Sequence, residues 1–169
     1  MASNAERRLM KDLKKIQAET NFDSITAIPD DDNLFKWTAL IFGPEGTEWD
    51  GGCFKLQMSF SDQYPNKAPE VRFVTDIFHP NVYKDGKICL DILQNNWSPV
   101  YDVQNVLISI QQLLTDPNNK SPANNEAAML FSDNYKEYIR RVKECVEKSK
   151  AEMEDVSDSS DEEEEEKKQ

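Results

Sequence analysis

A cysteine and an asparagine lie eight residues apart in a segment that contains the groups needed for acyl transfer. Cys89 stands in the mostly apolar stretch 87–93, and Asn81 closes the turn-forming motif His79-Pro80-Asn81. Transfer through a thioester requires a thiol as nucleophile and a fixed hydrogen-bond donor, such as an amide, for the oxyanion. The pair therefore predicts thioester chemistry, with the alternative that Cys89 is a buried structural thiol.

His79 is the one histidine in the chain. A cysteine hydrolase needs a base that activates the nucleophile, and a zinc site needs several ligands, so a lone histidine favours neither. We interpret His79 as a structural residue that bonds the backbone and braces the loop, with Pro80 in the same rigid turn. A carrier that exchanges one thioester for another needs no such base, so the sequence favours an acyl carrier without a metal.

Further short motifs surround Cys89 in a fixed order. Tyr64-Pro65-Asn66-Lys67-Ala68-Pro69 lies upstream, and Trp97-Ser98-Pro99 and Asp116-Pro117-Asn118 lie downstream. With His79-Pro80-Asn81 and Cys89, this series resembles the core of the ubiquitin-conjugating enzymes, from about Arg7 to about Ser149. The segments 95–97 and 121–124, together with an acidic tail, resemble the branch associated with histone and DNA-repair ubiquitination.

The resemblance implies that Cys89 accepts ubiquitin from the ubiquitin-activating enzyme and passes it to a substrate lysine, usually with a ring-type ligase. ATP is used by the activating enzyme, so this chain is expected to need no cofactor of its own. Asn81 is implied to support the oxyanion and to brace the catalytic loop, although an asparagine in a turn can also cap its own backbone.

Four further positions near the cysteine match positions of the family. Tyr83 matches an aromatic position near the incoming lysine, Asp91 a position that places the lysine or the loop, and Asn118 the mouth of the site. Packing or turn roles are the alternatives for all three. Ser121 stands where many relatives have an aspartate that orients the lysine, so we expect weak reactivity toward free lysine and dependence on a ligase. Ser121-Pro122 also resembles a phosphorylation site.

Two partner surfaces follow from the same resemblance. Arg7, Lys11 and Lys14 share one face of a predicted helix, and the resemblance implies that this face contacts the activating enzyme. The alternative is an ordinary solvated basic face. The residues implied to contact a ligase lie in two loops: Asn66, Trp97, Pro99 and Val100. Asn66 stands where many relatives have phenylalanine, which narrows the choice of ligases because an apolar anchor is missing.

The hydrophobic pattern predicts the elements that position these residues. Helical spacing of Leu9, Leu13 and Ile16 predicts a first helix over 4–18, and alternation predicts strands over 34–41, 53–60 and 71–74. Periodicity is absent over 76–101, and Asp102 is an expected N-cap. Helices are then expected over 103–115, 126–131 and 133–150. The fold class is α+β, and the resemblance implies a four-stranded antiparallel sheet flanked by an N-terminal helix and C-terminal helices.

Cys53 and Cys145 are interpreted as packing residues, Cys53 on the more polar side of its strand and Cys145 beside an apolar helical stripe. Three cysteines at scattered spacing fit a reducing compartment, so residence in the nucleus and cytoplasm is expected. The N-terminal residues lack the apolar segment of a signal peptide, and no apolar run reaches the roughly 20 residues of a membrane span.

Charge divides the 169 residues into an expected catalytic domain, 1–150, and an expected disordered acidic tail, 151–169. The tail holds ten acidic residues and two lysines, which is −8 of the net charge of −12, so −4 remains for the domain. The tail is predicted to tether basic substrates such as histones, with a solubilising role as the alternative. Direct nucleic-acid binding is not expected. A non-catalytic adaptor and an acidic histone-binding protein remain as alternative functions.

Overall fold

One antiparallel sheet, whose strands follow the order of the chain, forms the centre of the computed structural model. The structure describes residues 1–18 and 24–166, with side chains as far as Asp155. Its elements are α1 (Asn4–Ala18), β1 (Ile25–Asp30), β2 (Asn33–Phe42), β3 (Cys53–Ser59), β4 (Glu70–Phe73), the 3₁₀ helix η1 (Asp91–Leu93), α2 (Val103–Thr115), α3 (Asn125–Asp133) and α4 (Tyr135–Glu166). The predicted α+β class with a four-stranded antiparallel sheet is confirmed.

The register of the sheet brings apolar residues of all four strands onto one face. Ala39 of β2 lies opposite Ala27 of β1 and Leu56 of β3, and Leu56 lies opposite Phe73 of β4. These side chains are all buried. Because side chains alternate along a strand, one register fixes the whole face.

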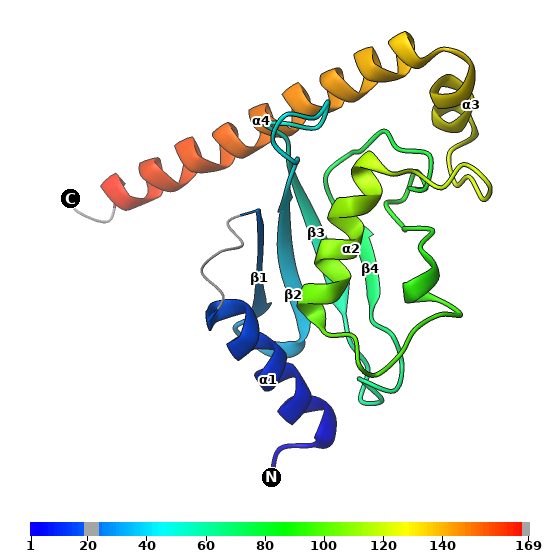
Figure 1. Ribbon diagram of the computed structural model, residues 1–169. Coiled ribbons are helices and arrows are strands. Elements are labelled where there is room, and N and C mark those ends of the chain that lie inside the picture. Colours follow the sequence, from blue (N-terminus) through cyan, green and yellow to red (C-terminus); the bar gives the residue numbers. More distant parts are fainter. Residues whose placement is uncertain (19–23, 167–169) are drawn as a thin grey trace.

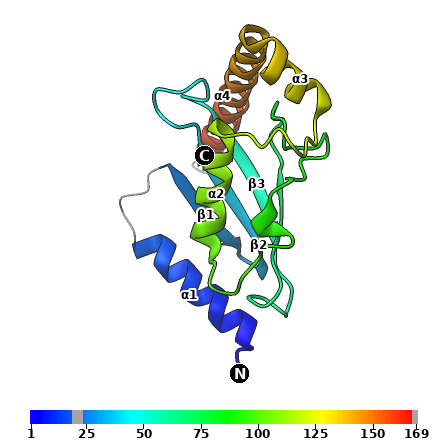
Figure 2. The same ribbon diagram turned by 45° about the vertical axis from the view of Figure 1, so that its right-hand side comes forward.

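Helices cover this face and the ends of the sheet. In Figures 1 and 2, α2 crosses the buried face, α1 lies at one end of the sheet and α4 passes across the other end. Asp102 caps α2 as predicted: its carboxylate accepts from the Asn105 amide at 2.8 Å, and the Asn105 side chain accepts from the Asp102 amide. The irregular segment that contains Cys89 lies beside β4, at the far side of the sheet from β1 (Figure 1).

Strand β1 was not found by the apolar pattern. Ile25 and Ala27 are buried, but Ile28 is 65% exposed and Pro29 follows it. The strand is short and lies at the edge of the sheet, where proline is tolerated and the alternation of apolar and polar residues is weak.

Cys53 lies on the side of β3 that also carries Lys55, Gln57 and Ser59, as predicted, but it is buried and not exposed. Its amide donates to the Ser149 hydroxyl of α4 at 3.2 Å. Helix α4 therefore covers this end of β3, a contact between residues far apart in the chain that strand alternation does not reveal.

The last helix was predicted to end near Lys150, with a disordered tail beyond it, but α4 continues to Glu166. Tyr138, Val142 and Val146 are buried, whereas residues 151–155 are exposed, so the extension continues a helix that is already anchored. Adding residues to an existing helix avoids the cost of nucleation, and the alanine, methionine and glutamate residues of this extension favour helices. The predicted division at residue 150 stays a prediction, and Lys167 and Lys168 lie outside the described residues.

No helix in the described part of the chain combines the length and the apolar character needed to cross a membrane. Among the same residues, no group of three or more His, Cys, Asp or Glu side chains is arranged to hold a metal ion.

Candidate active site

Backbone pairing brings Cys89 beside Asn81. The Cys89 amide donates to the Asn81 carbonyl at 2.8 Å, and Val82 and Ile88 form an isolated antiparallel bridge. A turn closes this pairing, with the Gly86 amide donating to the Tyr83 carbonyl at 2.9 Å. The Cys89 side chain is half-buried. The predicted nucleophile, Cys89, and the predicted side-chain amide donor, Asn81, therefore lie on the two paired arms of one tight loop.

His79 holds the start of this loop on the protein core. It is fully buried; its Nδ1 accepts from the Asn81 amide at 2.9 Å, and its Nε2 lies 2.7 Å from the Leu113 carbonyl of α2. These two partners require a neutral ring with the proton on Nε2. Burial lowers the pKa of His79 to about 4, although the bond to Leu113 offsets part of the shift. This geometry is that of a structural residue.

The Asn81 side chain connects the cysteine loop to the segment after α2. Its Oδ1 accepts from the Asn118 amide at 2.8 Å, and its Nδ2 donates to the Asn118 carbonyl at 2.7 Å and to the Ser121 carbonyl at 3.4 Å. The two short bonds fix the orientation of the amide group. Asn81 is almost fully buried, so this arrangement has the geometry of a brace.

The backbone of Pro80 also binds the segment that follows α2. Its carbonyl accepts from the amides of Ala123 at 2.7 Å and Asn124 at 3.0 Å. Asn124 is also the N-cap of α3, where its side chain accepts from the Ala127 amide. The structure therefore brings Asn118 and Ser121 to the cysteine loop through their backbones, while their side chains are exposed.

Tyr83 and Asp91 lie on either side of Cys89 in the chain. Tyr83 is 47% exposed and lines two surface pockets of about 410 and 360 Å³. Asp91 is exposed and is the first residue of η1: its Oδ1 accepts from the Ile92 amide at 2.8 Å, and its Oδ2 accepts from the Asn96 side chain at 3.2 Å. Asp91 therefore shapes the turn that follows the cysteine.

The two predicted ligase loops lie side by side. Trp97 Nε1 donates to the Pro65 carbonyl at 2.8 Å, so the half-buried indole ties loop 96–101 to loop 61–69. Asn66 and Pro99 are exposed, and Val100 is 78% exposed. The four predicted contact residues thus gather in one region, where Trp97 acts as a support and the other three face solvent.

Helix α1 presents different residues on its two sides. Arg7, Lys11 and Lys14 are exposed, which both a docking face and an ordinary solvated face predict. Arg8 and Asp12 were not singled out from the sequence, yet they point inward: Arg8 Nε donates to Asp12 Oδ1 at 2.9 Å, and Asp12 is 3% exposed. Their spacing of four residues, which places two side chains next to each other on a helix, could have indicated this ion pair in the sequence.

A family model described as ubiquitin-conjugating enzyme matches residues 8–146. The chain is 59% identical over 149 residues to "Ubiquitin-conjugating enzyme E2 3" of Arabidopsis thaliana, an alignment that covers 88% of this chain and 99% of that protein. It is 54% identical over 149 residues to "Ubiquitin-conjugating enzyme E2 2" of Fusarium solani, covering 88% of this chain and 98% of the relative. Because the family model and both relatives extend over the loop that joins Cys89 to Asn81, and over most of the chain, this protein belongs to the ubiquitin-conjugating enzymes.

Proposed function

We propose that Cys89 is the residue on which this transferase carries ubiquitin. The observation that supports this role is the half-buried thiol, whose backbone is fixed to Asn81. In charging, the Cys89 thiolate attacks the thioester of the activating enzyme, and the thiolate of that enzyme leaves. A neutral lysine amine then attacks the Cys89 thioester and an amide bond forms. The carbon–sulfur bond breaks, the Cys89 thiolate leaves with its electron pair, and the nitrogen releases a proton to solvent.

Asn81 is proposed to support the oxyanion as well as the loop. Its Nδ2 has two hydrogens, one in a short bond to Asn118 and one in a longer bond to Ser121. The longer bond is the one that can exchange for an oxyanion while the short bond keeps the loop in place. Free lysine has a pKa of about 10.4, so the site must also favour the neutral amine, which desolvation does. Tyr83 and Asn118 are the proposed surroundings of the lysine, and Asp91 is proposed to place the lysine or the loop.

A charging assay tests the role of Cys89. With activating enzyme, ATP and ubiquitin, the protein is expected to shift by one ubiquitin on a non-reducing gel, and a reducing agent should remove the shift. Cys89→Ser should instead give a reductant-resistant ester, whereas Cys145→Ser, a matched change outside the proposed site, should keep the reducible shift. A shift that persists unchanged in Cys89→Ser would assign the chemistry to another residue, and no shift would favour a non-catalytic adaptor.

Ser121 is proposed as a phosphorylation site that regulates transfer to lysine. Its side chain is exposed, its carbonyl is held by Asn81, and a phosphate would restore negative charge beside the incoming lysine. Enzyme treated with a proline-directed kinase should discharge to free lysine faster than untreated enzyme, and Ser121→Ala should show no such gain. Equal rates with and without the phosphate would refute this regulation.

We further propose that the acidic tail recruits basic substrates such as histones, in the nucleus as well as the cytoplasm. The net charge of −8 over 151–169 supports long-range attraction of a basic partner. Truncation after Ala151 should slow histone modification several-fold at low salt and should weaken its salt dependence, while charging stays unchanged. Replacing Glu162–Glu166 by glutamine removes negative charge but keeps the length of the tail. This variant therefore separates the effect of the charge from the effect of the length. Equal histone rates in all three proteins would contradict the proposal.

A further inference from the structure

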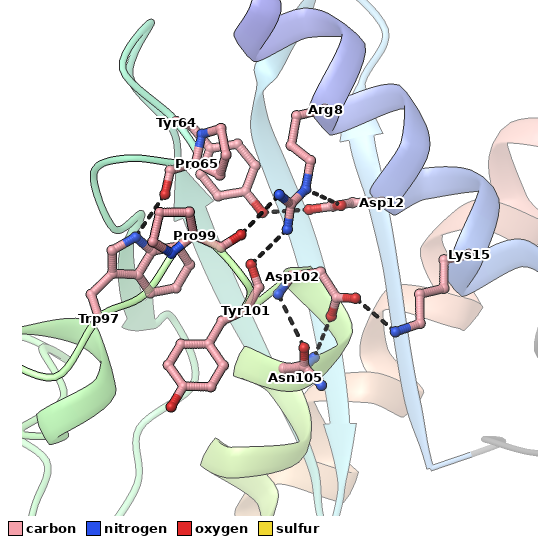
Figure 3. A network of polar contacts seen from close by, with 10 residues as sticks. All are labelled: Arg8, Asp12, Lys15, Tyr64, Pro65, Trp97, Pro99, Tyr101, Asp102 and Asn105. Atoms are coloured by element: carbon pink, nitrogen blue, oxygen red, sulfur yellow. Dashed lines mark hydrogen bonds and ion pairs between the residues drawn. The ribbon is translucent and has the colours of Figure 1, made fainter.

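A buried carboxylate on α1 lies where the two proposed ligase loops meet the helix (Figure 3). Asp12 is 3% exposed, and a buried carboxylate requires partners. One partner is the Arg8 guanidinium and the other is the Tyr64 hydroxyl, which donates to Asp12 Oδ2. Burial, reinforced by the Asp12 carboxylate, raises the pKa of Tyr64 far above its usual value, so the hydroxyl remains a donor. Tyr64 is the residue directly before Pro65 in loop 61–69.

Arg8 extends the same network into the second loop. Its Nε donates to Asp12, while its two terminal nitrogens donate to the carbonyls of Pro99 and Tyr101, each at 2.9 Å. Figure 3 shows the guanidinium between the carboxylate and the loop backbone. The planar guanidinium has donors in several fixed directions, which a lysine ammonium on a flexible stem does not reproduce. Arg8 therefore ties α1 directly to loop 96–101, next to the Lys15–Asp102 ion pair at 2.7 Å, which ties α1 to the residue after that loop.

Trp97 closes the network between the loops. Its indole donates to the Pro65 carbonyl, and its ring centroid lies 6.2 Å from that of Tyr64 and 5.8 Å from that of Tyr101. Both loops are thus fixed to each other and to α1, and the exposed Asn66, Pro99 and Val100 extend from backbone that this network holds.

We infer that Arg8 and Asp12 are positioning residues for ligase-dependent transfer: they hold the two loops in the arrangement that a ring-type ligase binds. This inference rests on the proposed ligase contacts in these loops. Neither residue approaches Cys89 through the contacts described, so the charging reaction and transfer without a ligase do not depend on them. The exposed basic residues of α1 lie on a different stripe of the helix from Arg8 and Asp12, so the two functions of the helix can be changed separately.

Arg8→Lys tests the inference, because it keeps the charge and removes the fork of donors. Arg140→Lys is the matched control: Arg140 also uses several guanidinium nitrogens at once, to bind the carboxylates of Glu137 and Glu144, but its side chain lies on the exposed face of α4. Amide hydrogen exchange in full-length Arg8→Lys should accelerate about tenfold in loops 61–69 and 96–101, where the Lys67 and Tyr101 amides are bonded locally. Exchange at the Cys89 amide should remain that of the unaltered protein.

The functional readout is discharge of pre-charged enzyme to lysine, with and without recombinant ring domains. A panel of such domains is screened first, and one that stimulates the unaltered enzyme is titrated. For Arg8→Lys, the ring concentration at half-maximal stimulation should rise about tenfold, with charging and ligase-free discharge unchanged. Arg140→Lys should match the unaltered enzyme in every measurement.

Several results would overturn the inference: unchanged loop exchange, faster exchange that includes Cys89 in the folded variant, or ligase-free discharge that falls as much as stimulated discharge. If Arg8→Lys does not fold, the same exchange and discharge measurements are made on Tyr64→Phe. This variant removes only the hydrogen bond from the Tyr64 hydroxyl to Asp12. If no ring domain stimulates the unaltered enzyme, the proposed ligase contacts fail, and loop exchange alone then decides whether Arg8 positions the loops.

Discussion

Cys53 and Cys145 are poor nucleophiles at neutral pH, because burial raises the pKa of each thiol, that of Cys145 to about 11. The thiolate is the reactive form of cysteine. With limiting iodoacetamide at about pH 7.5, Cys89 should therefore be alkylated at least about tenfold faster than either of the others. Peptide mass spectrometry measures the three rates, and Cys89→Ser should remain largely unlabelled. Modification of Cys145 before Cys89 would contradict this order.

For individual residues, short-range sequence patterns were sufficient to predict some roles but not others. Asp102 was predicted to cap α2 from its residue type and its place before an apolar helical pattern, and its observed partner, Asn105, lies only three residues away. Arg8 was missed because its carbonyl partners lie 91 and 93 residues along the chain. The Asn81 side chain bonds residues 37 and 40 positions away, so its role in the loop was supplied by resemblance and not by spacing. Short-range hydrogen bonds leave a pattern in the sequence, whereas long-range bonds depend on the completed fold.

At the scale of elements, the loop that carries Cys89 depends on one glycine. Gly86 has φ +90°, and a Cβ built on it would lie 2.0 Å from the Phe73 carbonyl oxygen of β4. The Phe73 amide also donates to the Gly86 carbonyl at 2.8 Å, so this contact joins the loop to the edge of the sheet. An alanine here would be strained and would push the loop away from β4.

Gly86→Ala should accordingly lower the free energy of unfolding by about 2–4 kcal/mol. Gly46→Ala is a matched control, because Gly46 has φ +76° but no heavy atom within 4 Å of its added Cβ, so only about 1 kcal/mol is expected. Urea unfolding of the two variants measures the difference. Equal losses would show that the close approach to Phe73 contributes nothing.

For the whole molecule, His79 makes stability depend on pH. Its pKa in the folded protein is about 4, below the usual value of about 6.5, so the unfolded chain binds the proton first as pH falls. The contribution is complete above about pH 6.5 and is lost as pH falls toward 4, a loss of about 3 kcal/mol. Urea unfolding between about pH 7 and pH 4.5 should show a shallower slope for His79→Gln than for the unaltered protein. Identical slopes would exclude this source of acid sensitivity.

The fold as a whole was predictable to the extent that apolar alternation and helical spacing are local. The buried faces of β2 and β3, the bounds of α1 and the cap of α2 follow from neighbouring residues. The edge strand β1, the cover that α4 provides over Cys53 and the length of α4 do not, because each depends on packing between distant segments or on extension of an anchored helix.

Trp97 gives this molecule a built-in optical reporter. Of the three tryptophans, Trp37 and Trp49 are fully buried, while Trp97 is half-buried between the two loops. A soluble collisional quencher such as acrylamide should therefore dim mainly the emission of Trp97. A protein that covers loops 61–69 and 96–101 should shield that emission, so occupancy of this surface can be followed on the unlabelled chain.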